Sequence, residues 1–328
     1  DEISSRQVSF IKDLVEKTLL NLTFPEEVSK LYDPVKYVLS AGGKRLRPVI
    51  TLMACNLFSD KIDNAVLPAA GLEIFHNFTL VHDDIMDNSS VRRNLPTVHA
   101  KWNLNQGILS GDVMVFIANE CFFYLPPDTL YEVLRIYNKS AIDVCTGQQL
   151  DMDFEKILTV SEKEYLRMIE LKTAALVAGC VKIGALLGGA EMKERDIMYE
   201  FGKNLGMAFQ IQDDLLDVYG DAKMFGKTTG ADITANKKTY LYVKAMESAS
   251  GKNLRILQSL FQNKDSDSSE KIKKVIEIYD ALHIKPATEN LAKNYISAAI
   301  TNLDNLPLAA DRKYEMKTLV ESLTGRNI

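Results

Sequence analysis

Apolar residues recur at helical spacing along almost the whole chain of 328 residues. The segments 8–22 (VSFIKDLVEKTLLNL), 130–145 (LYEVLRIYNKSAIDVC) and 270–284 (EKIKKVIEIYDALHI) place apolar side chains three and four positions apart. This spacing is typical of helices with one apolar face. No series of segments alternates apolar and polar residues, and no Asn-Gly or Asp-Gly pair marks a hairpin turn. We therefore predict an all-α protein of roughly ten or more helices.

The residues that break helices are few and lie at predicted helix ends. The chain has 17 glycines and 9 prolines, and segments such as AGG (41–43) and LGGA (187–190) separate helical patterns. No linker rich in proline or serine divides the chain, so we expect residues 1–328 to form a single domain. Apolar residues make up 46% of the chain, enough for a large core.

Charge and cysteine content exclude several classes of protein. The net charge of −5 argues against a general nucleic-acid binder. The four cysteines are scattered, which indicates a reducing compartment and neither a disulfide framework nor a zinc site. No apolar run approaches the roughly 18 residues of a membrane span, and the first residues lack the pattern of a signal peptide. We expect a cytoplasmic protein that is not an integral membrane protein.

Two acidic motifs of the form D-D-x-x-D carry the chemistry. On a helix their three aspartates fall at about 0°, 100° and 40°, on one face, and the apolar residues between them predict that both helices are largely buried. Like charges placed so closely need a cation, and oxygen ligands without cysteine or paired histidine favour Mg²⁺ over zinc. One such motif could equally be a solvated acidic face, but two identical motifs make that much less plausible. The predicted metal-binding residues are Asp83, Asp84, Asp87, Asp213, Asp214 and Asp217.

Basic residues accompany both motifs. The segment SAGGKRLRPVI (40–50) presents Lys44, Arg45 and Arg47 between two predicted helices, beside free backbone N–H groups. Further cations follow the acidic motifs at 92–93, 227 and 237. Guanidinium and ammonium groups suit phosphate oxygens, although each taken singly is more commonly a solvated surface charge. Together the motifs indicate two diphosphate substrates, one ionised through metal and one held by lysine and arginine alone.

The motifs occur in the order found in a known family. The chain resembles the trans-isoprenyl diphosphate synthases, or polyprenyl synthetases, which are head-to-tail prenyltransferases. The resemblance covers residues 31–232 and continues more weakly beyond them. One difference is Asn94, where the family usually has glycine after the arginine pair. The matching segments are GGKRLRP (42–48), EIFHNFTLVHDDIMD (73–87), RRN-PT-H (92–99), GDVMV (111–115), TGQQLD (146–151), ELKTA (170–174), AFQIQDDLLD (208–217) and GKTTGAD (226–232).

The resemblance implies a role for each matching residue. Mg²⁺, about three ions in each active site, would be chelated by Asp83, Asp87 and Asp213, with the other three aspartates as partners or outer ligands. The catalytic set would be Lys172, Thr173 and Gln210, supported by Gln148 and Asp151. Within this set, Thr173 and Gln210, together with the backbone carbonyls of the lysine–threonine helix, would stabilise the allylic cation. The allylic diphosphate would be bound by Arg92, Lys172, Lys227 and Lys237. The isopentenyl diphosphate would be bound by Lys44, Arg47, His76 and Arg93. His76 lies about 20° from Asp83 around an ideal helix, although a lone histidine is more often an ordinary core residue.

The resemblance also implies the fold and the product. It implies a helical bundle around a deep apolar cavity, a homodimer, and condensation of isopentenyl diphosphate with allylic diphosphates. Phe78 fits the pattern of short-chain members at the fifth position before the motif, whereas ideal helix geometry favours Thr79 as the floor of the cavity. Phe78 could also be an ordinary core aromatic. We predict all-trans products of fifteen to twenty carbons and favour twenty.

Three other functions remain open at this stage. A class I terpene cyclase also ionises diphosphates on a D-D-x-x-D helix, but it needs no second diphosphate site. A long-chain polyprenyl diphosphate synthase would share every motif and differ in its cavity. A non-catalytic regulatory subunit would be expected to lose charged site residues, and none is missing from this sequence.

Overall fold

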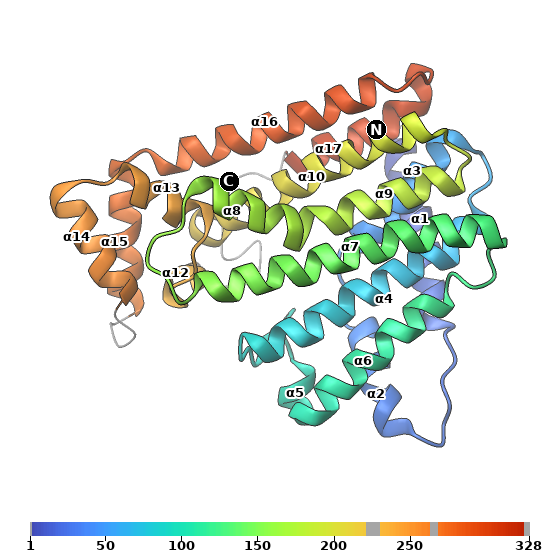
Figure 1. The fold of residues 1–328 in the computed structure, drawn as a ribbon, viewed down its shortest axis with the longest axis horizontal. Helices are drawn as coiled ribbons and strands as arrows, with labels where there is room; N and C mark the ends of the chain where they lie inside the picture. The colour runs from blue at the N-terminus through green and yellow to red at the C-terminus, as the bar shows by residue number, and fades with distance from the viewer. Residues whose placement is uncertain (1, 221–229, 263–267, 325–328) are drawn as a thin grey trace. The chain divides into compact units, whose positions relative to one another are not determined.

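The computed structural model describes residues 2–220, 230–262 and 268–324, which are almost entirely helical (Figure 1). The prediction of an all-α protein is confirmed. The elements are α1 (Glu2–Leu20), α2 (Ser29–Ser40), α3 (Leu46–Phe58), α4 (Asp63–Met86), β1 (Val91–Arg92), β2 (Leu95–Pro96), α5 (Val98–Lys101), α6 (Leu104–Glu120), α7 (Pro127–Phe154), α8 (Glu162–Ile169), η1 (Glu170–Ala174), α9 (Ala175–Leu187), α10 (Met192–Tyr219), α12 (Ala231–Thr234), α13 (Tyr240–Ser248), α14 (Gly251–Gln262), α15 (Ser268–Ala281), α16 (Ile284–Asp304) and α17 (Ala310–Thr324).

The chain forms two compact units, each built from separate stretches of sequence. The first unit comprises residues 1–137, 180–196 and 308–316, and the second comprises 138–179, 197–307 and 317–328. Helices α7, α9, α10 and α17 contribute residues to both units.

The first unit is built around α4, which packs against α3 and α6. The middle of α4 is buried on all sides, from Ala69 to Phe75. Gly71 lets α6 approach closely, because a Cβ at this position would lie 2.8 Å from the carbonyl oxygen of Ala118. A helix buried on all sides shows little amphipathic pattern, which explains the nearly continuous apolar run before the first acidic motif.

A short hairpin follows the first acidic motif. Val91 pairs with Pro96 and Arg92 pairs with Leu95, so the loop consists of Arg93 and Asn94 alone. Both loop residues are left-handed, with φ of 53° and 62°, as in a type I′ turn. The sequence prediction missed this hairpin because it lacks the usual Asn-Gly or Asp-Gly pair. Asparagine tolerates left-handed backbone better than most non-glycine residues, so Asn94 can serve where the family usually has glycine.

The second unit has its core between α8, α10, α13, α15 and α16. Met207, Ile211 and Leu215 lie on one face of α10 and belong to the same buried cluster as Leu241 and Tyr279. Helix α8 begins with a capping box in which Ser161 and Glu164 exchange hydrogen bonds with each other's backbone. The cap fixes where α8 begins, and α8 leads directly into η1.

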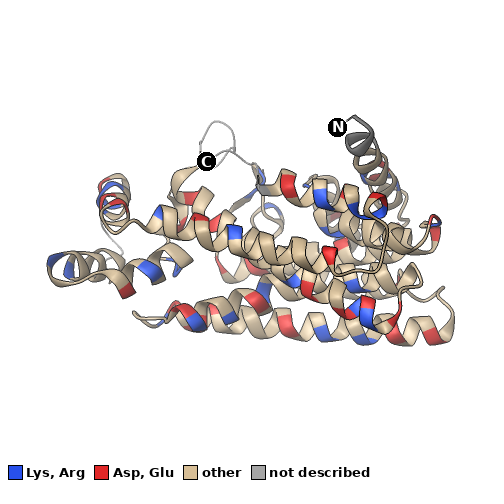
Figure 2. Cartoon of the chain, turned by 90° about the horizontal axis from the view of Figure 1, so that it is seen from above, with Lys and Arg blue, Asp and Glu red and all other residues tan. Residues whose placement is uncertain are grey.

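Charged residues of both signs occur along the helices (Figure 2). Figure 2 shows basic and acidic residues interspersed, consistent with the small net charge of −5. None of the helices in the described ranges is long and apolar enough to cross a membrane.

Candidate active site

The first acidic motif ends α4, and its three aspartates have different surroundings. Asp84 is buried and accepts two hydrogen bonds from Arg92, from Nη2 at 2.8 Å and from Nε at 2.9 Å. Burial raises the pKa of Asp84, and the Arg92 guanidinium offsets part of that rise. Asp83 is half-buried and Asp87 is exposed at the C-terminal cap of the helix. The middle aspartate therefore fixes the hairpin to α4, while the outer two are more accessible.

Arg47 and His76 form a pair in the first unit. Arg47 Nη1 lies 3.0 Å from His76 Nε2. Burial, together with Arg47 and other nearby arginines, holds the pKa of His76 well below its ordinary value. The imidazole is therefore neutral, and its Nε2 accepts the hydrogen bond from the guanidinium. Arg47 Nε is buried without a hydrogen-bond partner, which leaves donor capacity for an anion.

The other cations of the predicted isopentenyl site are Lys44, on the turn before α3, and Arg93, whose side chain reaches that turn from the hairpin. Lys44 is exposed. Arg93 Nη1 donates to the carbonyl oxygen of Gly42, and its guanidinium packs 3.0 Å from the position that a Cβ on Gly43 would occupy. Arg45 differs from its neighbours, because its side chain is fully buried in ion pairs with carboxylates. The expectation that Arg45 presents its charge to an anion beside Lys44 and Arg47 is wrong.

The second acidic motif lies near the end of α10 and repeats the division seen in the first. Asp214 is 2% exposed and accepts hydrogen bonds from the Tyr165 hydroxyl, from the Tyr240 backbone N–H at 3.0 Å and from Gln210 Nε2 at 2.9 Å. Burial raises the pKa of Asp214 to about 7. Asp213 is exposed, and Asp217 Oδ2 accepts from the Asp232 backbone N–H at 3.0 Å.

The predicted catalytic set surrounds a π-helical turn in the second unit. The turn η1 contains Lys172 and Thr173, and π-turns inside α-helices are frequent at functional sites. Lys172 Nζ lies 2.6 Å from Asp151 Oδ2, and Thr173 Oγ1 donates to Gln210 Oε1 at 3.0 Å. Gln210 therefore connects the π-turn to Asp214. The structure brings together Asp151, Lys172, Thr173 and Gln210 within this unit.

Close packing between α7 and η1 holds this arrangement. A Cβ at Gly147 would lie 2.2 Å from the Lys172 backbone nitrogen, so only glycine allows the two backbones to approach so closely. Gln148 follows on α7 and is buried. One turn later Asp151 reaches Lys172, so the spacing of TGQQLD sets the position of the lysine.

The lysines after the second motif are only partly described. Lys237 is exposed, with its Nζ 3.9 Å from Asp232 Oδ1. Lys227 lies outside the described residues. The predicted contribution of these lysines to allylic diphosphate binding stays a prediction.

The acidic motifs fit Mg²⁺ in donor type. The more exposed members, Asp83, Asp87 and Asp213, supply hard carboxylate oxygens. Within the described residues, no three His, Cys, Asp or Glu side chains come together in a geometry that could hold a metal ion. The donor chemistry of the motifs is therefore what supports magnesium.

Phe78 and Thr79 lie on α4, five and four residues before Asp83, and both are half-buried. The Phe78 ring contacts Phe75 and His82, with centroids 5.4 and 4.8 Å apart. Thr79 Oγ1 donates to the His76 carbonyl oxygen at 2.6 Å. Phe78 thus presents a large ring held on both sides by aromatic neighbours, whereas the Thr79 hydroxyl is turned back onto its own helix.

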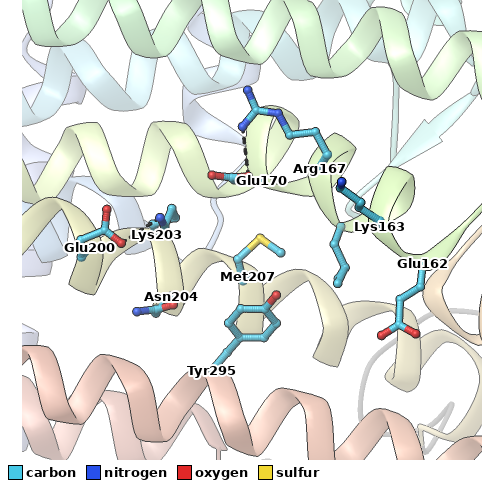
Figure 3. A pocket seen from close by; sticks show the side chains of 10 residues that line it. Glu162, Lys163, Arg167, Glu170, Glu200, Lys203, Asn204, Met207 and Tyr295 are labelled. Atoms are coloured by element: carbon cyan, nitrogen blue, oxygen red, sulfur yellow. Dashed lines mark hydrogen bonds and ion pairs between the residues drawn. The ribbon is translucent and has the colours of Figure 1, made fainter.

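A pocket of about 970 Å³ lies in the second unit (Figure 3). Side chains of α8, η1, α10 and α16 line it, with Leu166, Met207 and Tyr295 among charged residues. Its charges are largely paired, as in Arg167 with Glu170 and Lys203 with Glu200. The pocket contains none of the residues predicted for the active site.

Sequence reasoning missed several residues that support the site. Tyr165 and Tyr240 hold Asp214, and nothing in the sequence marks them beyond their places on apolar helix faces. Glu73 is 2% exposed, and the signal for it was an acidic residue inside the apolar run of α4. Glu16 gives no signal, because an acidic residue is ordinary on the amphipathic helix α1.

Comparison with known proteins identifies the family. Residues 28–279 match the polyprenyl synthetase family model. A short chain isoprenyl diphosphate synthase of Methanocaldococcus jannaschii is 39% identical over 282 residues, covering 85% of this chain and 84% of the relative. A geranylgeranyl diphosphate synthase of Sulfolobus acidocaldarius is 36% identical over 315 residues, covering 95% and 93%. A crystal structure of a geranylgeranyl pyrophosphate synthase superposes with a TM-score of 0.91 at 39% identity, covering 99% of this chain and 98% of the other. The chain belongs to the polyprenyl synthetases, the trans-isoprenyl diphosphate synthases, and is a prenyltransferase.

Proposed function

We propose that this enzyme condenses isopentenyl diphosphate head to tail with allylic diphosphates, giving all-trans prenyl diphosphates and free diphosphate. The observation that carries this proposal is the repeated division within the two acidic motifs. In each motif the middle aspartate is buried and bonded, Asp84 to Arg92 and Asp214 to Tyr165, while the first aspartate is more exposed. Such an arrangement orients the outer carboxylates for a cation and a diphosphate.

Magnesium is the proposed cofactor. When bound, it would neutralise the diphosphate and make it a better leaving group. Asp83, Asp87 and Asp213 would hold it, with Asp84, Asp214 and Asp217 as the residues that fix their helices. Three ions in each active site remain part of this proposal, drawn from the family resemblance.

The residues around η1 would handle the allylic substrate. Lys172, oriented by Asp151, would bind the diphosphate as the bond from the first carbon to oxygen breaks. Thr173 and Gln210 would present oxygen atoms toward the positive charge that develops on the allylic carbon, with Gln148 in support. Arg92, which is held by Asp84, would also bind the allylic diphosphate. Lys237 and Lys227 would bind the same diphosphate.

Lys44, Arg47, His76 and Arg93 would hold the isopentenyl diphosphate. Neutral His76 accepts from Arg47 and so orients the guanidinium toward the ligand. The isopentenyl double bond would attack the allylic carbon, and the proton lost would pass to the released diphosphate. No covalent enzyme intermediate is needed.

We propose products of fifteen to twenty carbons, with twenty favoured. The size of Phe78 and its aromatic neighbours supports a short cavity. Thr79, which is small, supports room for one unit beyond fifteen carbons.

The assembly and setting of the enzyme are also proposals. We propose one synthase domain that includes both units, because the family match runs through both. We propose a homodimer, supported by exposed apolar side chains on α6 such as Leu109 and Phe116, 56% and 67% exposed. A reducing, cytoplasmic setting is supported by four free cysteines, three of them buried.

One assay tests the reaction. The purified protein is mixed with Mg²⁺, isopentenyl diphosphate and dimethylallyl, geranyl or farnesyl diphosphate in turn, and released diphosphate is measured. We expect release only when both substrates are present, and extraction should yield prenyl diphosphates of fifteen to twenty carbons. Release from an allylic diphosphate alone would instead indicate a cyclase, and no release with any pair would indicate a non-catalytic subunit.

A further inference from the structure

Arg45 is a buried cation of the first unit, 2% exposed, and its partners come from three different helices. Its Nε lies 2.7 Å from Glu16 Oε1 and its Nη2 lies 3.2 Å from Glu16 Oε2, a two-pronged contact with α1. Its Nη1 lies 3.2 Å from Glu73 Oε1 on α4, and Nη2 also donates to the Leu39 carbonyl oxygen on α2. The side chain of Arg45 is fully buried. Four of the five guanidinium N–H groups already contact protein oxygens, and the buried side chain is not open to an anionic ligand.

The backbone around Arg45 adopts conformations that need external support. Gly42 and Gly43 have φ of 76° and 135°, and Arg45 itself is left-handed with φ of 50°. A non-glycine residue in this region is disfavoured and persists where the surroundings hold it. The ion pairs with Glu16 and Glu73 provide that support. Lys44 and Arg47 flank Arg45 in the chain, so the same contacts set where these two cations point.

Glu73 also acts on the other cations of the predicted isopentenyl site. Burial lowers the pKa values of Arg47 and Arg93, and the negative charge of Glu73 opposes the shift in both. Asn77 Nδ2 donates to Glu73 Oε1 at 3.1 Å and holds the carboxylate in place. Glu73 is thus a buried counter-charge shared by three arginines.

We infer that Glu16, Arg45 and Glu73 form a positioning cluster for the isopentenyl diphosphate site, through which helix α1 controls binding of that substrate. This inference rests on the proposed function for the identity of the substrate. Arg45 does not touch the ligand. Glu16 and Glu73 neutralise its charge, and its side chain fixes the turn that carries Lys44 and Arg47.

Glu16 offers the cleanest test, because its side chain is 31% exposed and its loss should not prevent folding. We compare Glu16→Ala, Glu16→Gln and Arg45→Lys with Val15→Ala, which removes buried methyl groups from the same turn of α1 and leaves the carboxylate. Calorimetry in excess chelator measures binding of inorganic pyrophosphate, so that metal at the acidic motifs does not contribute. Steady-state kinetics measure KM for each substrate and kcat.

We expect Glu16→Ala to weaken pyrophosphate binding and raise KM for isopentenyl diphosphate by about tenfold, the effect of one charge-assisted contact. KM for the allylic substrate and kcat should change by less than about twofold. Glu16→Gln, which keeps one acceptor, should restore part of the binding. Arg45→Lys should weaken pyrophosphate binding as much as Glu16→Ala does. If Arg45→Lys does not fold, the two Glu16 variants alone test the inference.

Unchanged pyrophosphate binding in Glu16→Ala would overturn the inference, as would equal weakening in Val15→Ala. If pyrophosphate binding follows the expected order but the wild type does not condense the substrates, the proposed function fails and the positioning cluster stands.

Discussion

Replacing Gly147 by alanine tests the packing that holds the catalytic lysine. The new Cβ would lie 2.2 Å from the Lys172 backbone nitrogen and 2.6 Å from its Cα. Ordinary contact begins near 3.4 Å, so α7 and η1 must separate by about 1.2 Å. Both contacts are with backbone, which cannot rotate away as a flexible side chain could.

The separation has two measurable consequences. Overpacking of this kind costs about 1–3 kcal/mol of unfolding free energy. The Lys172–Asp151 contact of 2.6 Å would lengthen beyond hydrogen-bond range, and a displacement of about 1 Å at a catalytic group can cost about 10²-fold in rate. We therefore expect kcat to fall about 100-fold, while KM for isopentenyl diphosphate changes little.

Gly188→Ala is the matched control. Its Cβ would lie 2.5 Å from the Cys55 carbonyl oxygen in the first unit, away from η1, so it should lose similar stability and keep kcat. Urea unfolding gives the stability of each variant, and diphosphate release gives kcat. A folded Gly147→Ala enzyme with kcat within about threefold of wild type would refute the reasoning, as would an equal loss of kcat in the control.

Three further predictions concern the metal, the imidazole and the product. Asp83→Ala and Asp213→Ala should each lower kcat by orders of magnitude, and excess chelator should abolish turnover until Mg²⁺ is restored; near-normal turnover in either variant would contradict the metal assignment. His76 stays neutral in the folded protein but is protonated below about pH 6.5 in the unfolded chain, because its pKa is depressed only in the fold. The unfolding free energy of the wild type should therefore fall, relative to that of His76→Gln, by up to about 1.4 kcal/mol per pH unit below that point. Urea unfolding at pH 7.5 and 5.5 measures this, and parallel stability curves for the two proteins would contradict a depressed pKa. Phe78→Ala should lengthen the product by at least one five-carbon unit, as sized by chromatography of the extracted products, whereas an unchanged product would show that another side chain forms the floor.

Helical periodicity was enough to predict the fold class, because most helices bury one face and expose another. It failed where a local signal was weak or absent. The hairpin at 91–96 turns on Arg93 and Asn94, and that pair favours left-handed backbone less strongly than Asn-Gly does. The π-turn at 170–174 contains no helix breaker, so its extra residue per turn depends on packing against Gly147 and Gly206 rather than on its own sequence.

The charged residues show a second limit, because sequence gives their identity and not their partners. Lys44, Arg45 and Arg47 look equivalent in the segment GGKRLRP, yet one of them is neutralised by carboxylates that lie 29 and 28 residues away along the chain. A prediction from local spacing cannot find such partners. Glu16 and Glu73 come from different helices, and only the fold brings them to one arginine.

The acidic motifs show how far spacing alone can go. Ideal helix geometry puts the first and third aspartates about 40° apart and the middle one about 100° from the first. That offset turns the middle carboxylate toward neighbouring elements, where Asp84 meets Arg92 and Asp214 meets Tyr165 and Tyr240. Helix geometry therefore predicts that the middle aspartate differs in role from the outer two. It does not predict which residues the middle aspartate contacts. If the angles set these roles, Asp84→Asn and Asp214→Asn should lower the unfolding free energy more than Asp83→Asn and Asp213→Asn. The first two changes break a buried network, whereas the other two only replace a more accessible carboxylate by an amide. Urea unfolding without metal measures this, and equal losses at all four positions would contradict the division.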